Sequence, residues 1–210
     1  MVGIATQRQD HAVAAVPSVT GGKVVVVGDM VPDPATGVSL THAQDVARRG
    51  IAEAAAAYGF VGDEQYERGQ LALYRNVFDL IWGSVKPKSF AATGNHEYGN
   101  GTNSGWASTG GGFYDYFGSR ALSGGKSYFS FNVNHSNGTH THFVILNSAC
   151  GSYSGSTWTT PSCDRYGAMN NWLRQDLNAD SARCEVVLWH EPAFATPAPW
   201  PGRVAMRTPW

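Results

Sequence analysis

Charged residues and cysteines are both scarce in this chain of 210 residues. Lysine, arginine, aspartate and glutamate make up 15% of the sequence, against about 25% in an average soluble protein. The formal net charge is −1, so the sequence lacks the strongly basic character that a nucleic-acid-binding surface requires. No run of roughly 18 apolar residues is present, and the sequence therefore predicts no membrane span.

The three cysteines are too few for a small disulfide scaffold. Cys150 and Cys163 flank a loop rich in Gly, Ser and Thr that one disulfide could close, which would leave Cys184 unpaired. Such a bridge suits an exported protein, and we therefore expect a secreted or extracytoplasmic location. The first 20 residues contain no sustained apolar core of the kind that is typical of a signal peptide. We expect residues 1–22 to form an N-terminal extension and residues 23–210 to form one domain.

Short polar segments follow four apolar runs that have the length and composition of buried strands. The runs are Lys23–Val27, Ala57–Val61, Ser89–Thr93 and Glu185–Trp189. The residues that follow them are, in the same order, Gly28-Asp29, Gly62-Asp63, Gly94-Asn95 and His190. Because aligned strands end at the same edge of a sheet, these segments predict a ligand site at that edge.

The intervals between these segments predict helical connections. Asp29 to Asp63 and Asp63 to Asn95 each fit one strand-helix-strand crossover of roughly 30 residues or more. Periodic apolar side chains predict three helices whose apolar faces pack in the core. The helices are Thr41–Ala57, with Thr41 as N-cap, Glu67–Trp82 and Arg165–Leu177.

Two further segments, Tyr128–Val133 and Thr141–Leu146, alternate between polar and apolar residues and predict paired strands of a second sheet. The polar stretch Asn134–Thr141 predicts the turn that joins them. We expect the histidines in this region to be exposed, namely His135, His140 and His142.

The order of four short motifs resembles that of the calcineurin-like metallophosphoesterases, and most of all their purple acid phosphatase branch. The motifs are Gly28-Asp29, Gly62-Asp63-Glu64-Gln65-Tyr66, Gly94-Asn95-His96-Glu97 and His190-Glu191-Pro192, of which the third is the most specific. The resemblance extends from Val24 to Phe194. It implies an α/β fold, a four-layer αββα sandwich with two mixed β-sheets, of which this chain lacks the C-terminal part.

The resemblance also implies a role for each residue of the site and a pair of metal ions, iron with zinc, manganese or a second iron. Asp29 would bind the first ion, Asp63 would bridge both, and Tyr66 would bind ferric iron as a phenolate. Asn95 and His190 would hold the second ion. His96 would donate a proton to the leaving group, with Glu97 orienting it from the second layer of the site.

The same residues suit the hydrolysis of a small phosphorylated substrate on chemical grounds. A phosphate ester repels hydroxide, and two cations about 3.5–4 Å apart both neutralise it and lower the pKa of the attacking water. Imidazole is a good ligand for zinc and iron, whereas carboxylate and amide oxygens suit harder ions. Histidine titrates close to neutral pH, so His96 is the natural proton donor. The stretch Tyr98–Gly112, which follows this motif, predicts a loop that either shapes substrate entry or is a plain surface insertion.

The chain departs from the family pattern in two places. Val31 stands where the commoner Asp-x-His motif has its histidine, a loss that Tyr66 would offset as a ligand. No histidine follows His190, where the family has a Gly-His-x-His segment, so we expect a truncated ligand set.

These departures leave other interpretations open. A phosphodiesterase or nucleotidase could use the same residues, or the chain could keep the fold as a binding module without catalysis. Taken singly, Asp29 or Asp63 could be a turn residue. Tyr66 could be an ordinary packed tyrosine, and His190 could merely close a strand.

Overall fold

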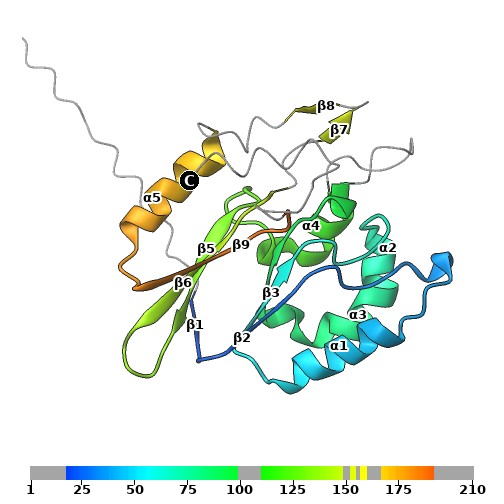
Figure 1. Ribbon diagram of the computed structural model, residues 1–210, viewed down its shortest axis with the longest axis horizontal. Coiled ribbons are helices and arrows are strands. Elements are labelled where there is room, and N and C mark those ends of the chain that lie inside the picture. The colour runs from blue at the N-terminus through cyan, green and yellow to red at the C-terminus, as the bar shows by residue number, and fades with distance from the viewer. Residues whose placement is uncertain (1–17, 99–109, 149–151, 155–156, 160–166, 192–210) are drawn as a thin grey trace, which may run out of the picture.

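The part of the chain described by the computed structural model comprises residues 18–98, 110–148, 152–154, 157–159 and 167–191. Two main β-sheets pack face to face, and helices cover the outer face of each sheet (Figure 1). The predicted mixed α/β class is confirmed.

A parallel three-stranded sheet carries the first three polar segments at its carboxyl edge. Its strands are β2 (Val24–Val27), β3 (Ala57–Val61) and β4 (Ser89–Ala92). The order is β2-β3-β4, and both pairings are parallel. All three strands were predicted. Among the described residues this sheet is parallel throughout rather than mixed as expected, because helical crossovers join its strands.

The second sheet has four strands in the order β1-β5-β6-β9. They are β1 (Ser18–Thr20), β5 (Phe129–Asn134), β6 (His140–Ile145) and β9 (Cys184–Leu188). β5 and β6 form the predicted antiparallel hairpin, whereas β1 and β9 run parallel to their neighbours, so this sheet is mixed. β1 precedes residue 23, the predicted start of the domain. A separate antiparallel pair consists of β7 (Ser152–Ser154) and β8 (Thr157–Thr159).

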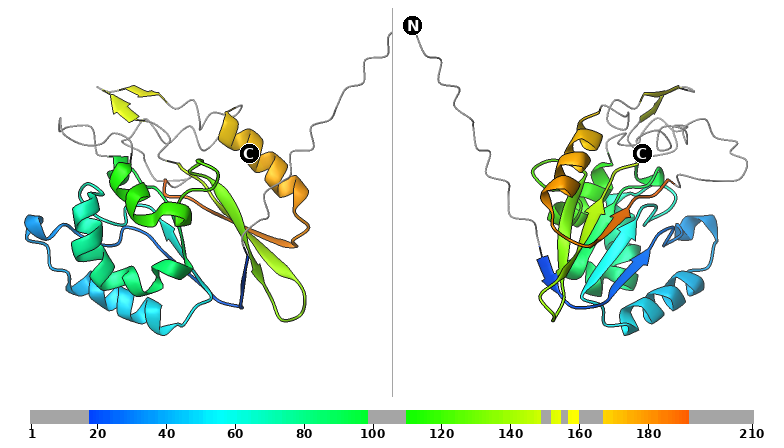
Figure 2. Two further views of the ribbon diagram at one scale, coloured as in Figure 1. Left: turned by 180° about the vertical axis from the view of Figure 1, so that it is seen from behind. Right: turned by 60° about the vertical axis from the view of Figure 1, so that its left-hand side comes forward.

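Helices lie on the outer side of both sheets, as the turned views of Figure 2 show. Among the described residues, the earlier α-helices of the chain pack on the three-stranded sheet, and one later helix packs on the four-stranded sheet. The helices on the three-stranded sheet are α1 (Thr41–Ala52), α2 (Leu71–Leu73), α3 (Asp79–Trp82) and α4 (Gly111–Phe117). The single helix on the opposite side is α5 (Ala168–Ala179). Apolar clusters fill the three spaces between these layers.

The cluster between the two sheets fixes their separation. Phe90 of β4 stacks on Phe131 of β5 with ring centroids 3.7 Å apart. A Cβ at Gly59 of β3 would lie 2.8 Å from Leu188 Cδ1 of β9. The absence of a side chain at Gly59 therefore lets β9, and the residues that follow it, approach the three-stranded sheet.

The predicted helix bounds differ from the observed ones. α1 ends at Ala52 rather than Ala57, because Ala57 already belongs to β3. Thr41 is not the N-cap but the first helical residue, and its N–H donates to the hydroxyl of Ser39 at 3.2 Å. The third helix is displaced from Arg165–Leu177 to Ala168–Ala179.

The helix predicted from Glu67 begins only at Leu71. The preceding residues form a loop instead, in which the N–H of Tyr66 donates to the carbonyl of Val31 at 2.8 Å. After α2 the chain continues as a π-helical turn, Tyr74–Phe78, and then as α3. A 3₁₀ helix, Gly83–Lys88, leads into β4.

Two further predictions concern segments at the border of the described residues. Cys150 and Cys163 lie outside them, and Cys184 is exposed with a free thiol. Within the predicted loop Tyr98–Gly112, residues 99–109 lie outside, and Gly111 already begins α4. None of the described helices is both long and apolar enough to cross a bilayer.

His142 is buried, contrary to the prediction, and joins β6 to α5. Its Nε2 lies 2.8 Å from Asp176 Oδ2, and its Nδ1 lies 2.7 Å from Asn132 Oδ1 and 3.3 Å from Asp180 Oδ2. His140 Nε2 adds a contact of 2.8 Å to Asp180 Oδ1. The prediction failed because alternate residues of β6 face α5, whose position the local sequence does not reveal. These contacts attach α5 to the sheet through polar groups.

The pKa of Asp180 predicts how this attachment responds to acid. Burial acts to raise this pKa, but the N–H of Ala182, the hydrogen bond to His140 and the charge of His142 outweigh it, so the pKa is lowered. A carboxyl group with a lowered pKa in the folded state stabilises the fold at pH values above its unfolded-state pKa of about 3.9. This stabilisation is lost as the pH falls through the folded-state pKa.

We therefore expect Asp180→Asn to lower the free energy of unfolding by about 1–3 kcal/mol at pH 7, and the difference from the unsubstituted protein to shrink below about pH 4. Urea unfolding at a series of pH values measures this. Asp45→Asn, which removes only an exposed pair with Arg48, should change stability by less than about 0.5 kcal/mol. A difference for Asp180→Asn that stays constant down to about pH 3 would contradict the assignment.

Candidate metal centre

The loops after β2 and β3 continue side by side beyond the ends of the strands. Asp29 N donates to Gly62 O at 3.1 Å, Met30 N donates to Asp63 O at 2.9 Å, and Val31 pairs with Gln65 in an isolated bridge. These bonds extend the parallel pairing of β2 with β3 and place Asp29 beside Asp63. The sheet itself therefore brings the first two predicted ligands together.

Asp29 and Asp63 share an uncommon backbone conformation. Each has a φ of 53°, in the left-handed region that most residues avoid. Aspartate enters this region more readily than larger residues because its short polar side chain can bond locally. Such conformations concentrate at functional sites, where the surrounding structure maintains them.

Two glycines allow the loops to approach closely. A Cβ at Gly62 would lie 2.6 Å from Gly94 N and 2.7 Å from His190 Cβ. A Cβ at Gly94 would lie 2.5 Å from Asp63 N. Since real Cβ atoms do not come so close to backbone, both positions require glycine if the loops after β3, β4 and β9 are to meet.

Three predicted ligands form one compact cluster. Single ligand atoms of Asp29, Asp63 and His190 all lie within 4.8 Å of one another. Asn95 extends the cluster, since its Oδ1 lies 3.2 Å from His190 Nε2. Asp63 is 3% exposed and lies at the centre, whereas Asp29 is exposed. The four residues leave four different strands and meet at one edge.

His190 carries a defined hydrogen-bond pattern. Its Nδ1 lies 3.0 Å from the carbonyl oxygen of Val61, which can only accept, so Nδ1 holds a proton and donates it. Its Nε2 faces Asp63 Oδ2 at 3.4 Å. In the neutral ring, Nε2 would therefore present a lone pair to the cluster, as a metal ligand must.

The pKa values of His190 and Asp63 move apart, as expected for an ion pair. Burial acts to lower the pKa of His190, but the hydrogen bond and charge of Asp63, with the charge of Asp29, raise it to about 9. Burial likewise acts to raise the pKa of Asp63, and His190 and His96 outweigh this effect and lower it. Asp63 therefore stays ionised although it is buried.

Tyr66 lies next to Asp29. Its hydroxyl donates to Asp29 Oδ1 at 2.6 Å, and its ring centroid lies 4.5 Å from that of His96. Burial raises the pKa of Tyr66, and the hydrogen bond to Asp29 and the charge of Asp63 raise it further. Tyr66 can therefore become a phenolate only beside a strong positive charge.

Hydrogen bonds fix both the backbone and the ring of His96. Its backbone N–H donates to the side-chain oxygen Asp63 Oδ1 at 3.0 Å, and its ring Nδ1 lies 2.6 Å from the carbonyl oxygen of Glu67. Because that oxygen only accepts, Nδ1 is the donor. Nε2 is left facing the cluster, 3.8 Å from Asp63 Oδ2.

Glu97, which we expect to orient His96, has its hydrogen bonds to the main chain of two loops and to one tyrosine. It is 2% exposed and accepts hydrogen bonds from the N–H groups of Asp63, Glu64 and Gly94 and from the hydroxyl of Tyr74. Burial and the charge of Asp63 raise the pKa of Glu97. Glu97 thus holds the backbone of two loops.

Sequence reasoning missed three residues that support this cluster. Ser148 Oγ accepts hydrogen bonds from His190 N at 3.2 Å and Glu191 N at 2.8 Å. Glu64 is fully buried, and its Oε1 accepts from Gly62 N at 3.0 Å. The hydroxyl of Tyr74 donates a hydrogen bond to Glu97. Of the three, only Ser148 could have been predicted from the sequence, because it is a polar residue that follows strand β6, as the predicted ligands follow their own strands.

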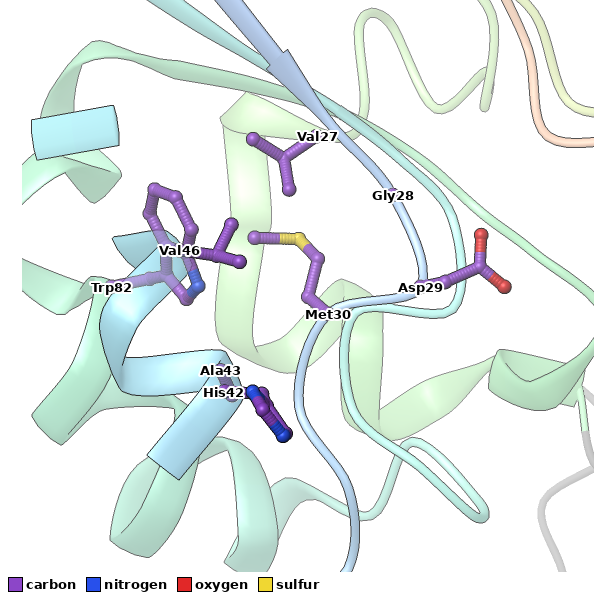
Figure 3. Close-up of a pocket in the computed structure, with 8 residues that line it drawn as sticks. All are labelled: Val27, Gly28, Asp29, Met30, His42, Ala43, Val46 and Trp82. Carbon is purple, nitrogen blue, oxygen red and sulfur yellow. The ribbon is translucent and has the colours of Figure 1, made fainter. Parts of the chain in front are cut away.

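A separate apolar pocket lies on the other side of the Asp29 loop. It is lined by Val27, Gly28, Asp29, Met30, His42, Ala43, Val46 and Trp82. Figure 3 shows that the carboxylate of Asp29 points away from the apolar side chains of this pocket. The pocket and the ligand cluster are therefore distinct.

Models of known protein families and curated protein sequences do not match this chain. The site is therefore judged from its own donor atoms. Carboxylate oxygens, an amide oxygen and an imidazole nitrogen converge, and these are donor atoms that could hold a metal ion. All seven residues predicted from the sequence lie in or directly beside this cluster.

Two effects would make a side chain at Gly62 unfavourable, namely its positive φ and the close approach of neighbouring loops, and a second glycine allows them to be measured separately. Gly62 and Gly37 have φ values of 93° and 77°, but nothing lies within 4 Å of a Cβ at Gly37. We expect Gly37→Ala to cost about 1 kcal/mol and Gly62→Ala to cost about 2 kcal/mol more, because it also forces apart the loops that carry Gly94 and His190. Urea unfolding of both variants measures the difference, and equal costs would contradict the observed approach.

Proposed function

We propose that this chain is a metal-dependent phosphoesterase of the calcineurin-like type, closest to the purple acid phosphatases, that hydrolyses phosphate monoesters. The observation that carries the proposal is the convergence of Asp29, Asp63, Asn95 and His190 at one sheet edge. Each comes from a different strand and offers an oxygen or imidazole ligand. The layering of helices, sheet, sheet and helix also suits the αββα sandwich of that family.

The donor set fits a pair of metal ions. Asp29 and Tyr66 would hold the first ion, Asn95 and His190 would hold the second, and Asp63 would be shared. Asp63 suits a bridging role because it is central, buried and ionised. When bound, two such ions would neutralise a phosphate ester and lower the pKa of the attacking water.

The remaining chemistry falls to His96. The leaving alkoxide of a phosphate ester needs a proton, and a donor must lie within reach of it. His96 Nδ1 is committed to the carbonyl of Glu67, which fixes the ring and leaves Nε2 toward the cluster. We assign His96 Nε2 as the donor of that proton.

Metal content and hydrolysis together test this proposal. Metal content is measured on protein purified without added metal and again after loading with iron and zinc. The loaded protein should hold close to two metal ions per chain. It should also hydrolyse p-nitrophenyl phosphate faster than bis(p-nitrophenyl) phosphate. Asp63→Asn should lose metal and lower kcat at least about 100-fold, because it removes the shared charge.

Asp45→Asn is the matched control, since Asp45 is an exposed residue of α1, and it should leave metal content and rate unchanged. Faster hydrolysis of the diester would replace the monoesterase assignment by a phosphodiesterase. A folded protein that retains no metal would refute the catalytic proposal and favour a binding module.

The assignment of Tyr66 as an iron ligand has its own test. With ferric iron bound, a coordinated phenolate should give a visible phenolate-to-iron absorption band. Tyr66→Phe should abolish the band, because it removes the oxygen that lies 2.6 Å from Asp29 Oδ1. Tyr128→Phe, which alters a tyrosine packed against Trp172 beside α5, should keep it. A colourless iron-loaded protein would show that Tyr66 is not a ligand.

A further inference from the structure

Glu97 joins two loops that carry predicted ligands. Its Oε2 accepts from Asp63 N at 2.9 Å and from Gly94 N at 2.7 Å, and its Oε1 accepts from Glu64 N at 3.1 Å. The first and third of these amides follow β3, and the second follows β4. The carboxylate of Glu97 therefore sets the spacing between the loops of Asp63 and Asn95.

Tyr74 is the side-chain donor to this carboxylate. Its hydroxyl donates to Glu97 Oε1 at 3.0 Å, and the residue is 0% exposed. Through this bond Tyr74, which belongs to the helical layer, acts on both loops. None of the hydrogen bonds described above joins Tyr74 directly to Asp63 or Asn95. The position of the hydroxyl thus matters for the position of Glu97.

The ring of Tyr74 is fixed by aromatic packing. It stacks on Tyr116 with centroids 5.1 Å apart and meets Phe78 and Phe117 edge-on at 5.5 and 5.7 Å. Tyr74 also begins the π-helical turn Tyr74–Phe78, and single π-helical turns of this kind occur frequently at functional sites. Because Tyr74 is fully buried and its ring packs against these three rings, its hydroxyl is directed to Glu97.

We propose that Tyr74 is a positioning residue of the metal centre, which holds Glu97 so that the loops of Asp63 and Asn95 keep the spacing needed to bind metal. The chain of contacts runs from the aromatic core to the Tyr74 hydroxyl, then to Glu97, and from Glu97 to three amides. The consequence for metal binding rests on the proposed function, whereas the effect on the amides does not.

Tyr74→Phe tests the proposal because it removes one oxygen and keeps the ring. The matched control is Tyr58→Phe, which removes another buried hydroxyl from the same apolar cluster. The Tyr58 hydroxyl accepts from Ala55 N at 3.2 Å and has no bond to Glu97 among those of the described residues. Far-ultraviolet circular dichroism and urea midpoints establish that both variants fold.

Amide hydrogen exchange of the unloaded proteins is the first measurement. In Tyr74→Phe, the amides of Asp63, Glu64 and Gly94 should exchange at least about tenfold faster than in the unsubstituted protein. In Tyr58→Phe they should not change relative to it. Glu97→Gln keeps one acceptor oxygen, so it should expose the amides on one side only, either those of Asp63 and Gly94 or that of Glu64.

Zinc titration of the same proteins is the second measurement. Tyr74→Phe should bind zinc about tenfold more weakly, the lower end of the loss seen when a group that supports a metal ligand is removed, and Tyr58→Phe should bind it as the unsubstituted protein does. Unchanged amides in Tyr74→Phe, or equal exposure in Tyr58→Phe, would overturn the proposal. Failure of the unsubstituted protein to bind zinc would instead overturn the proposed function, while the exchange data would still decide the role of Tyr74.

Discussion

The contact between Asp63 and His190 joins the two sheets at their common edge, and the arrangement of the site depends on it. Asp63 follows β3 of the three-stranded sheet, and His190 follows β9 of the four-stranded sheet. Their oxygen and nitrogen lie 3.4 Å apart, and His190 is also anchored to the carbonyl of Val61. Both residues can meet only because the packing between the sheets, including the close approach at Gly59, sets their separation. The site is therefore a product of the inter-sheet core.

Backbone groups, more than side chains, assemble the rest of the site. The loops of Asp29 and Asp63 are paired by main-chain hydrogen bonds, and both residues adopt left-handed conformations that the pairing maintains. Gly62 and Gly94 remove the side chains that would keep the loops apart. Since backbone positions move less than long side chains, a ligand set built in this way is held in place at a small entropic cost.

Features that depend on neighbouring residues in the chain could be predicted from the sequence, whereas contacts between residues distant in the chain could not. Polar residues at the ends of apolar runs identified the edge of the sheet, because the end of a strand and the residue that follows it are adjacent in the chain. The start of α2 at Leu71 was mispredicted, since the loop before it is held by Val31 of another segment. The burial of His142 depends on α5, and the role of Tyr74 depends on Glu97. These contacts join residues far apart in sequence, where periodicity and spacing carry no information.

Three acidic residues are buried side by side at this edge, and each is accommodated differently. Burying a carboxylate is costly unless it is paired, hydrogen-bonded or protonated. Glu97 is met by three amides and one hydroxyl. Burial and the charge of Glu97 raise the pKa of Glu64 well above its usual range, and Glu64 Oε1 accepts a hydrogen bond from Gly62 N. Only Asp63 has its pKa lowered, and it faces the imidazole of His190. Of these three carboxyl groups, the one whose pKa is lowered is thus the one that lies in the cluster, as would suit a shared metal ligand, whereas the other two accept hydrogen bonds from the loops.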